Sequence, residues 1–243
     1  MMVEYVDNPC PPRADQMLRK AFARSERDGM NTLPITKRAQ ILSLLVEGKS
    51  LRACSRIADV SINTVTKLLV DVGTACADYQ DKTLRNLPCK RVQCDEIWSF
   101  VGAKQKNVPV EMQGIFGIGD VWTWTAMCAD TKIMASWMVG GRDSESAKVF
   151  IGGLSGRLAN RIQLTRDGNR LYIDAVERAF AGDVDYAMLV KHYNDEHKSP
   201  ERKYSPSSFV SADKRRINGD PDLAHVSTSY VERQNLAVSR ISK

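Results

Sequence analysis

The chain has 243 residues, of which 43% are hydrophobic and 26% are charged, and its formal net charge at pH 7 is +6. This composition is that of an ordinary globular protein, and the length suits one medium domain together with a small one. No apolar run approaches the length of a membrane span, and the N-terminus has no apolar signal segment, so we expect neither feature. The six cysteines form no C-x-x-C pair, which predicts reduced thiols in a cytosol and no zinc site. The basic excess is compatible with a polyanionic partner but does not by itself indicate one.

The N-terminal third of the sequence predicts helices. Residues 1–29 are broken by prolines and lack a hydrophobic period, which predicts a loosely ordered extension. In residues 30–88, apolar side chains recur at helical spacing in three stretches, with Thr36, Ser50 and Ser61 as the expected N-terminal caps. A short second helix, a tight turn and a third helix are typical of a helix-turn-helix DNA-binding domain.

In such a domain the third helix enters the major groove with its N-terminal residues near the base edges. Asn and Lys side chains can bond purine edges, Ser and Thr more often position phosphates, and arginines on the second helix can neutralise phosphates. The alternative is a three-helix bundle that only packs and has a solvated polar face. The candidate DNA-binding residues are Arg52, Arg56, Ser61, Asn63, Thr64 and Lys67.

After Pro88 the pattern changes to stretches rich in β-branched and aromatic residues, which predict strands. Three strands come first, with a long hairpin connection between the first two, and strands and helices then alternate. This order predicts an α/β (α+β) domain over 89–243 with a mixed sheet, helices on its faces and the ribonuclease-H-like order. The expected strands are 90–101, 120–130, 132–143, 160–168 and 185–193; the expected helices are 144–158, 171–180 and 227–243; 194–226 is expected to be an irregular insertion.

Three acidic residues occupy positions where this topology brings separate segments together. Asp95 lies inside an otherwise apolar strand, where an unpaired carboxylate is costly. Asp167 follows the end of another strand, which is where open α/β sheets bind ligands, and Glu232 lies in the first turns of the last helix. Carboxylate oxygens suit Mg²⁺, with Mn²⁺ as an alternative, and such ions support in-line displacement at phosphorus. The alternatives are a surface charge, an ordinary Asp-Gly turn and a solvated helix residue.

Glu96 adjoins Asp95, but strand alternation sends its side chain to the opposite face of the sheet. It is expected to be either a group that supports the metal ligands from behind or a plain surface charge, and we do not include it among the expected metal ligands.

From Met30 onward the sequence closely resembles transposases of the insertion-sequence-one family of bacterial mobile elements. The resemblance covers nearly all of residues 30–238, and it is carried by LVEGKSLRACSRIADVSINTVTKLLVDVG, LPCKRVQCDEIWSFV, GDVWTWTA and STSYVERQNL. It implies a DDE-type enzyme that cleaves double-stranded DNA at transposon ends and joins the free 3′-hydroxyl to a target, as a homo-oligomer in the active complex. The acidic triad of the family falls on Asp95, Asp167 and Glu232.

The resemblance also shows two departures. Relatives continue past YVERQNL with a basic run, so we expect a C-terminally truncated copy. Only Cys10 precedes the predicted helix-turn-helix, so we expect the upstream zinc-binding segment of the wider family to be absent or to lie elsewhere. The competing predictions are a DNA-binding regulator or inactive transposase relic, and a ribonuclease-H-like nuclease unrelated to transposition. All of these predict a protein of the bacterial cytoplasm that is associated with the nucleoid.

Overall fold

The computed structural model describes residues 33–115, 117–168, 172–194 and 208–241, so the predicted extension over 1–29 lies outside the described residues. The chain forms two compact units: three helices belong to the first, and the second runs over Leu84–Ser239. No helix in the described ranges combines the length and the apolar composition that crossing a bilayer requires.

The first unit contains three helices, α2 (Ile35–Val46), α3 (Leu51–Ala58) and α4 (Ile62–Thr83). They enclose a small apolar core, because one face of each helix is apolar at helical spacing. Its buried members are Ile41, Leu45, Cys54, Ala58, Val65 and Leu68.

Local capping sets where these helices begin. The Ser50 hydroxyl oxygen accepts the Ala53 N–H at 3.2 Å and caps α3, as the sequence predicted. The prediction that Thr36 caps α2 is wrong: Pro34 precedes the helix at φ −53°, already close to the helical value, and it supplies no side-chain cap. Asp59 makes the turn after α3 at φ 49°, a left-handed conformation that Asp tolerates better than most residues.

The second unit is built on one six-stranded mixed sheet with the order β3-β2-β1-β4-β5-β6. Strands β1, β2 and β3 form an antiparallel meander, β4 and β5 run parallel to β1, and β6 returns antiparallel to β5. The mixed sheet confirms the predicted α/β class. The strands are β1 (Arg91–Val101), β2 (Gly119–Cys128), β3 (Met134–Gly140), β4 (Ile162–Asp167), β5 (Val184–Asn194) and β6 (Ser208–Asn218).

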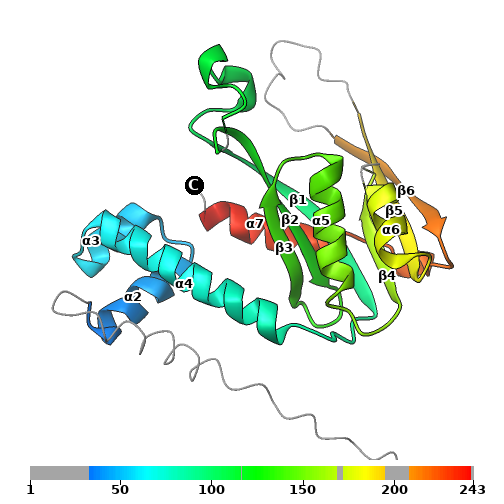
Figure 1. Cartoon of the computed structure of the whole chain (residues 1–243), viewed down its shortest axis with the longest axis horizontal. Helices are drawn as coiled ribbons and strands as arrows, with labels where there is room; N and C mark the ends of the chain where they lie inside the picture. The colour runs from blue at the N-terminus through cyan, green and yellow to red at the C-terminus, as the bar shows by residue number, and fades with distance from the viewer. Residues whose placement is uncertain (1–32, 116, 169–171, 195–207, 242–243) are drawn as a thin grey trace, which may run out of the picture. The chain divides into compact units, whose positions relative to one another are not determined.

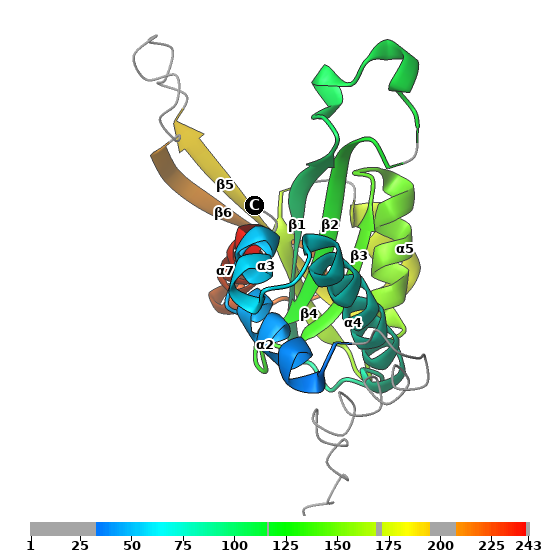
Figure 2. The ribbon, with the colours of Figure 1, turned by 90° about the vertical axis from the view of Figure 1, so that its left-hand side faces the viewer.

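Helices cover both faces of this sheet. Parallel strands need crossover connections, and α5 (Ser144–Ser155) and α6 (Tyr172–Phe180) precede β4 and β5 and lie on one face. On that face Trp124, Phe150 and Tyr172 are buried in the main apolar core. Helix α7 (Ser229–Ile241) lies on the opposite face, as Figure 2 shows. The two faces therefore differ, with an apolar core under α5 and α6 and a more polar layer under α7.

Two connections complete the unit. The link between β1 and β2 contains the short 3-10 helices η1 (Gln105–Asn107) and η2 (Val110–Met112), and η4 (Leu223–His225) precedes α7. The prediction that 194–226 is irregular is wrong for part of that stretch, because β6 and η4 lie within it, while 195–207 lies outside the described residues. The sequence did not predict strand β6, because its side chains are mostly polar and exposed on both faces and therefore show no hydrophobic alternation.

Candidate active site

Asp95 and Asp167 occupy adjacent positions on neighbouring parallel strands. The register pairs Cys94 of β1 with Arg166 of β4, so the two aspartates follow one step further along each strand. Cys94 and Arg166 are buried on the α5 and α6 side, so strand alternation directs Asp95 and Asp167 to the face that α7 covers. The carboxyl end of β4 thus places two carboxylates side by side beneath one helix.

The environment of Asp95 disfavours its charge. Burial raises the pKa of the Asp95 carboxyl to about 6, although hydrogen bonds from the Glu96 backbone and the Asn235 side chain act in the opposite direction. The negative charges of Asp167 and Glu96 raise it further. A half-buried carboxyl beside a second carboxylate is a place where a bound cation gains energy, because the cation relieves both burial and repulsion.

Helix α7 is attached to the sheet by polar side chains of β1 and β2. The buried Gln93 side-chain oxygen accepts the backbone N–H groups of Tyr230 at 3.0 Å and Val231 at 3.2 Å, which satisfies two donors of the first helical turn. One turn later, the Asn235 amide donates to Asp95 Oδ2 at 2.8 Å. These contacts fix the helix that carries Glu232 over β1.

The same contacts orient the Asp95 carboxyl group. The Thr125 hydroxyl lies 3.1 Å from both the Asp95 carbonyl oxygen and the Asn235 amide oxygen, and it donates to one of them at a time. Asn235 and Thr125 are buried, so their hydrogen bonds hold one arrangement of the amide with its donor toward Asp95.

Glu232 faces the sheet from the first turn of α7. Its carboxylate accepts a hydrogen bond from the Thr228 hydroxyl and forms an ion pair with the ammonium group of Lys191 on β5. Lys191 lies two residues beyond Leu189, the β5 partner of Asp167, and therefore on the same face as Asp167. The three predicted carboxylates thus share one face of the sheet. The third of them, Glu232, is paired with Lys191.

This donor set suits a hard divalent cation, because it consists of carboxylate oxygens beside a solvent-accessible strand end. The side chains as placed are not gathered around one point: among the described residues, no group of three or more His, Cys, Asp or Glu side chains could hold a metal ion. Asp95 and Asp167 are adjacent, whereas Glu232 contacts Lys191 and Thr228. A cation held by all three would have to replace Lys191 at Glu232.

Glu96 lies on the opposite face, in an ion-pair network that Arg166 connects to Asp167. Its carboxylate accepts the Arg166 guanidinium at 3.0 Å and lies 3.5 Å from Arg142. Its side chain is 3% exposed and that of Arg166 is 0% exposed, so this is a buried ion pair. Arg166 also pairs with Asp167 and lies 3.5 Å from the centre of the Tyr172 ring. Glu96 is therefore an ion-pair partner within the core.

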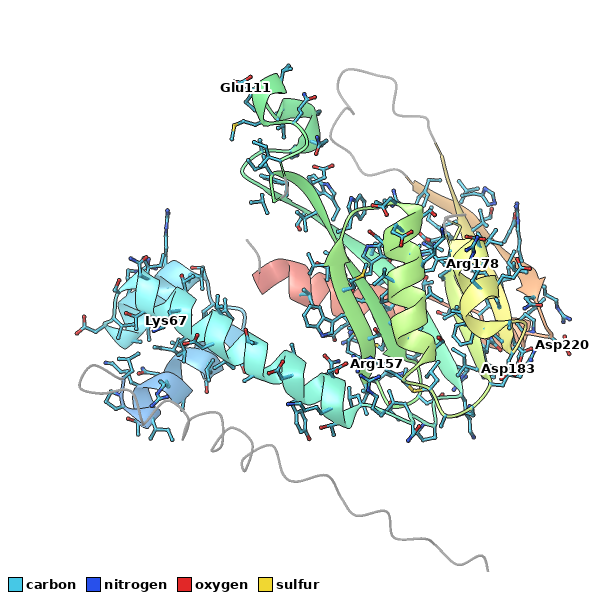
Figure 3. The ribbon with its side chains drawn as sticks, in the orientation of Figure 1. Lys67, Glu111, Arg157, Arg178, Asp183 and Asp220 are labelled. Atoms are coloured by element: carbon cyan, nitrogen blue, oxygen red, sulfur yellow. The ribbon has the colours of Figure 1, made fainter. Side chains whose placement is uncertain are left out.

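The predicted DNA-binding residues all lie in the first unit: Arg52 and Arg56 are on α3, and Ser61, Asn63, Thr64 and Lys67 lie just before or within the first two turns of α4. The Ser61 hydroxyl oxygen accepts the Asn63 N–H at 3.2 Å at the start of α4, so this side chain is engaged locally. Thr64 is half-buried, while the remaining candidates are exposed and can meet a partner; these are Arg52, Arg56, Asn63 and Lys67. Figure 3 shows Lys67 on the first unit.

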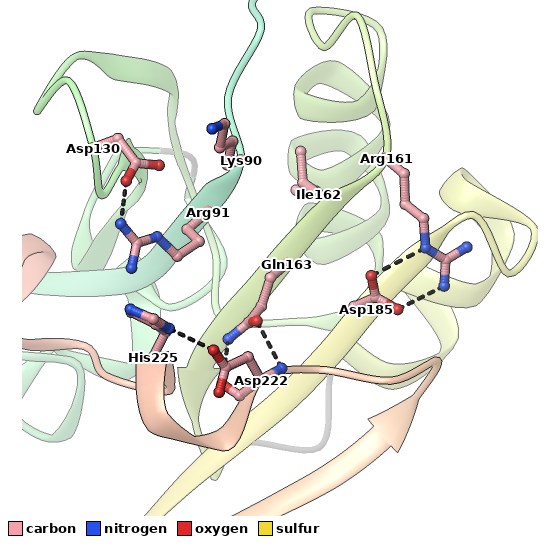
Figure 4. Close-up of a pocket in the computed structure, with 9 residues that line it drawn as sticks. All are labelled: Lys90, Arg91, Asp130, Arg161, Ile162, Gln163, Asp185, Asp222 and His225. Carbon is pink, nitrogen blue, oxygen red and sulfur yellow. Dashed lines mark hydrogen bonds and ion pairs between the residues drawn. The ribbon is translucent and has the colours of Figure 1, made fainter.

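A shallow hollow lies at the opposite ends of the strands, where β1, β4 and β5 begin (Figure 4). Most of its charged side chains are paired: Arg91 pairs with Asp130, Arg161 with Asp185 and His225 with Asp222. Gln163 exchanges two hydrogen bonds with the backbone of Asp222, which ties the η4 segment to β4. These contacts join strand ends and loops, so the hollow is a structural junction.

Sequence reasoning missed four polar residues around the carboxylates: Gln93, Thr125, Lys191 and Asn235. Gln93 had a usable signal, because it lies two residues before Asp95 and therefore on the same face of β1. Asn235 had a similar one, three residues after Glu232 on α7. Lys191 and Thr125 had none, because their neighbours come from distant segments.

Comparison with known proteins adds no relative to this description. No protein-family model matches the chain, and no curated protein matches it.

Proposed function

We propose that this chain is a DDE-type DNA transposase of the insertion-sequence-one kind, which cleaves DNA and joins the free end to a target. The observation that carries the proposal is the pair Asp95 and Asp167 at adjacent positions of parallel strands, beneath the helix that bears Glu232. The order of an antiparallel meander followed by two strands parallel to β1 supports a ribonuclease-H-like fold for this unit.

In this proposal Asp95, Asp167 and Glu232 hold Mg²⁺ or Mn²⁺. Two such ions would activate a water or a 3′-hydroxyl and stabilise the leaving oxygen at phosphorus. The chain's own residues prepare that site. Asn235 and Thr125 orient the Asp95 carboxyl, Gln93 fixes the first turn of α7, and Lys191 neutralises Glu232 until a cation takes its place.

The first unit would supply DNA recognition as a helix-turn-helix. Its support is a short helix, a left-handed turn at Asp59 and a longer helix whose N-terminal side chains are exposed. Transposases of this kind commonly act as multimers that hold two DNA ends together, and we therefore include a homo-oligomer in the proposal.

Strand transfer tests the function directly. The purified chain is incubated with Mg²⁺, a linear DNA carrying the sequences that flank its gene, and a supercoiled plasmid target. We expect nicked ends and joined products, and Asp167→Asn and Glu232→Gln to remove both. Asp174→Asn, which alters an exposed carboxylate on α6, is the matched control and retains activity. Nicking without joining would favour an unrelated nuclease, and activity that survives both carboxylate substitutions would contradict the proposal.

One observation favours a second candidate, a DNA-binding regulator or inactive relic. The Lys191–Glu232 ion pair leaves the third carboxylate engaged by the protein itself. If Mg²⁺ never produces nicks while the chain binds its DNA ends, this second function is the better one.

Substituting Lys191 with methionine is expected to tighten Mn²⁺ binding about 2- to 5-fold. This fold-change corresponds to the free energy of a partly exposed ion pair, which is under about 1 kcal/mol. The reason is that the metal no longer competes with the ammonium group for Glu232. Titration calorimetry measures the affinity without any reaction. Lys214→Met removes the same charge from the neighbouring strand and should leave the affinity almost unchanged. Equal or weaker binding by Lys191→Met would show that the lysine does not compete.

In the first unit, Asn63→Ala and Lys67→Ala are expected to weaken binding to duplex DNA by roughly 10- to 100-fold each, equivalent to about 1–3 kcal/mol per base contact. Lys82→Ala lies in the last turn of the same helix and serves as the matched control. Fluorescence anisotropy at several salt concentrations gives both affinity and salt dependence. If Lys82→Ala weakens binding as much as Lys67→Ala, the recognition surface has been placed wrongly.

A further inference from the structure

The β5–β6 ribbon has two chemically different faces. Cross-strand pairing shows which side chains share a face, because directly opposed residues point the same way. The face shared with α7 includes Leu189, which packs with Leu223 and Val226. Counting outward along it, the opposed pairs are Ala187 with Arg216, Leu189 with Lys214, Lys191 with Ala212, and Tyr193 with Phe209.

The other face is close to neutral. Asp213 lies there between two basic neighbours, 2.9 Å from His192 Nε2 and 3.7 Å from the Arg215 guanidinium. Arg215 is therefore compensated by an acidic side chain on its own face. This difference makes Arg215 a natural control for Lys214, the adjacent residue on the opposite face.

The α7 face keeps more of its positive charge. The Lys214 ammonium donates to the neutral Leu223 carbonyl oxygen at 2.6 Å, so this contact does not neutralise it. Arg216 pairs with Asp220, but both side chains are exposed, at 55% and 85%, and such pairs exchange easily with solvent or with a phosphate. Lys191 lies next on this face, and its ammonium group pairs with Glu232. Three cationic side chains thus lie along this face, from Arg216 through Lys214 to Lys191 at the candidate active site.

An aromatic pair follows these cations on the same face. The Tyr193 and Phe209 rings lie 6.2 Å apart at an interplanar angle of 77°, and the two residues are 53% and 60% exposed. Two exposed rings at the end of an edge ribbon bury little apolar area in the chain itself. Rings beside a row of cations form the combination by which proteins hold unpaired nucleic acid, with phosphates on the cations and bases stacked on the rings.

We propose that the α7 face of the β5–β6 ribbon, made of Lys191, Lys214, Arg216, Tyr193 and Phe209, binds a single-stranded segment of DNA next to the carboxylates. This inference rests on the proposed function, since it places the strand that leaves the active site. Paired bases in a duplex do not present their faces to a ring, so the aromatic pair selects for an unpaired strand.

The test measures binding of a short fluorescent single strand and of the matching duplex by anisotropy, without divalent metal. The Tyr193→Ala/Phe209→Ala variant is expected to lose roughly 10- to 100-fold in affinity for the single strand, the effect of removing stacking on one base at about 1–3 kcal/mol, and little for the duplex. The control is Trp98→Ala/Phe100→Ala, which removes another exposed pair with rings 5.8 Å apart on β1. We expect this control to bind as the wild type does.

The charge component has its own matched pair. Lys214→Gln is expected to weaken single-strand binding and to lower the slope of log affinity against log salt by about 0.7, the value for one phosphate contact. Arg215→Gln, on the neutral face, should leave the slope unchanged. Thermal melting of each variant establishes that it is folded, and Tyr193→Leu replaces the alanine double variant if that one is not.

Three outcomes overturn the inference: equal losses for the two aromatic variants, an equal slope for Lys214→Gln and Arg215→Gln, or tighter binding of single-stranded RNA than of DNA. Failure of the proposed function is recorded separately, in the strand-transfer assay with Asp167→Asn and Glu232→Gln. Cleavage that depends on the carboxylates, with single-strand binding that ignores the ribbon, would overturn this inference and leave the function intact.

Discussion

Replacing Asp95 with asparagine is expected to abolish Mg²⁺-dependent DNA cleavage and, at the same time, to stabilise the fold at neutral pH. The fold gains because the substitution removes a carboxylate whose charge is disfavoured by burial and by Asp167. The asparagine side-chain oxygen can still accept the Asn235 amide, so the contact with α7 is kept. We expect a gain of about 1–3 kcal/mol in the free energy of unfolding at pH 8.

The pH dependence follows from the direction of the pKa change. The Asp95 pKa is raised from 3.8 to about 6 in the folded chain, so the folded state binds the proton more tightly than the unfolded state does. Its contribution to stability is complete below the unfolded pKa and is lost as the pH rises from about 4 to about 6. Asp95→Asn therefore flattens this part of the stability curve.

Urea unfolding at a series of pH values measures this effect, since all four tryptophans lie in the Leu84–Ser239 unit and their fluorescence reports on it. Asp143→Ala, which removes the side chain that caps α5, is a control expected to destabilise. A loss of stability at pH 8 on replacing Asp95 would show that its carboxylate is a net stabilising group and would contradict this account of the site.

The second large effect is expected from Arg166→Met, which should destabilise the second unit by roughly 3–5 kcal/mol. The substitution leaves the carboxylate of Glu96, 3% exposed, without the guanidinium that is fully buried beside it. It also removes the contact with the Tyr172 ring and a partner of Asp167. The same tryptophan-monitored unfolding measures the loss.

Two further variants separate the causes. Arg178→Met breaks an exposed i,i+4 pair with Asp174 and is expected to cost less than about 0.5 kcal/mol. The double variant Arg166→Met/Glu96→Leu removes both buried charges and should recover much of the stability. If the double variant is as unstable as Arg166→Met or more so, removing Glu96 recovers nothing and the destabilisation comes from packing.

The sequence was sufficient for features that depend on local pattern. Strand alternation places Glu96 on the face away from Asp95, and the apolar and aromatic runs predict β1 to β5 and the helices between them. The adjacency of Asp95 and Asp167 follows from two strand positions once β1 and β4 are neighbours. The roles of these carboxylates, and of the exposed residues of α3 and α4, remain predictions.

Features that depend on pairing between distant segments could not be predicted from the sequence. Nothing near Lys191 in the sequence indicates that it meets Glu232, because their contact requires both the sheet order and the docking of α7. Strand β6 has polar side chains on both faces, so its pairing with β5 leaves no hydrophobic alternation to read. The two bulges in that pairing also shift which side chains share a face.

The attachment of α7 has a consequence for motion. Val231 is the buried apolar residue among the described side chains of this helix, and Gln93 and Asn235 provide hydrogen bonds that water can replace. An element held mainly in this way can open locally without unfolding the sheet beneath it. Amides of α7 should then exchange with deuterium sooner than those of β1, and each opening would carry Glu232 away from the two aspartates. Assembly of the third carboxylate would be a reversible event, and DNA or a cation bound beneath the helix would slow that exchange.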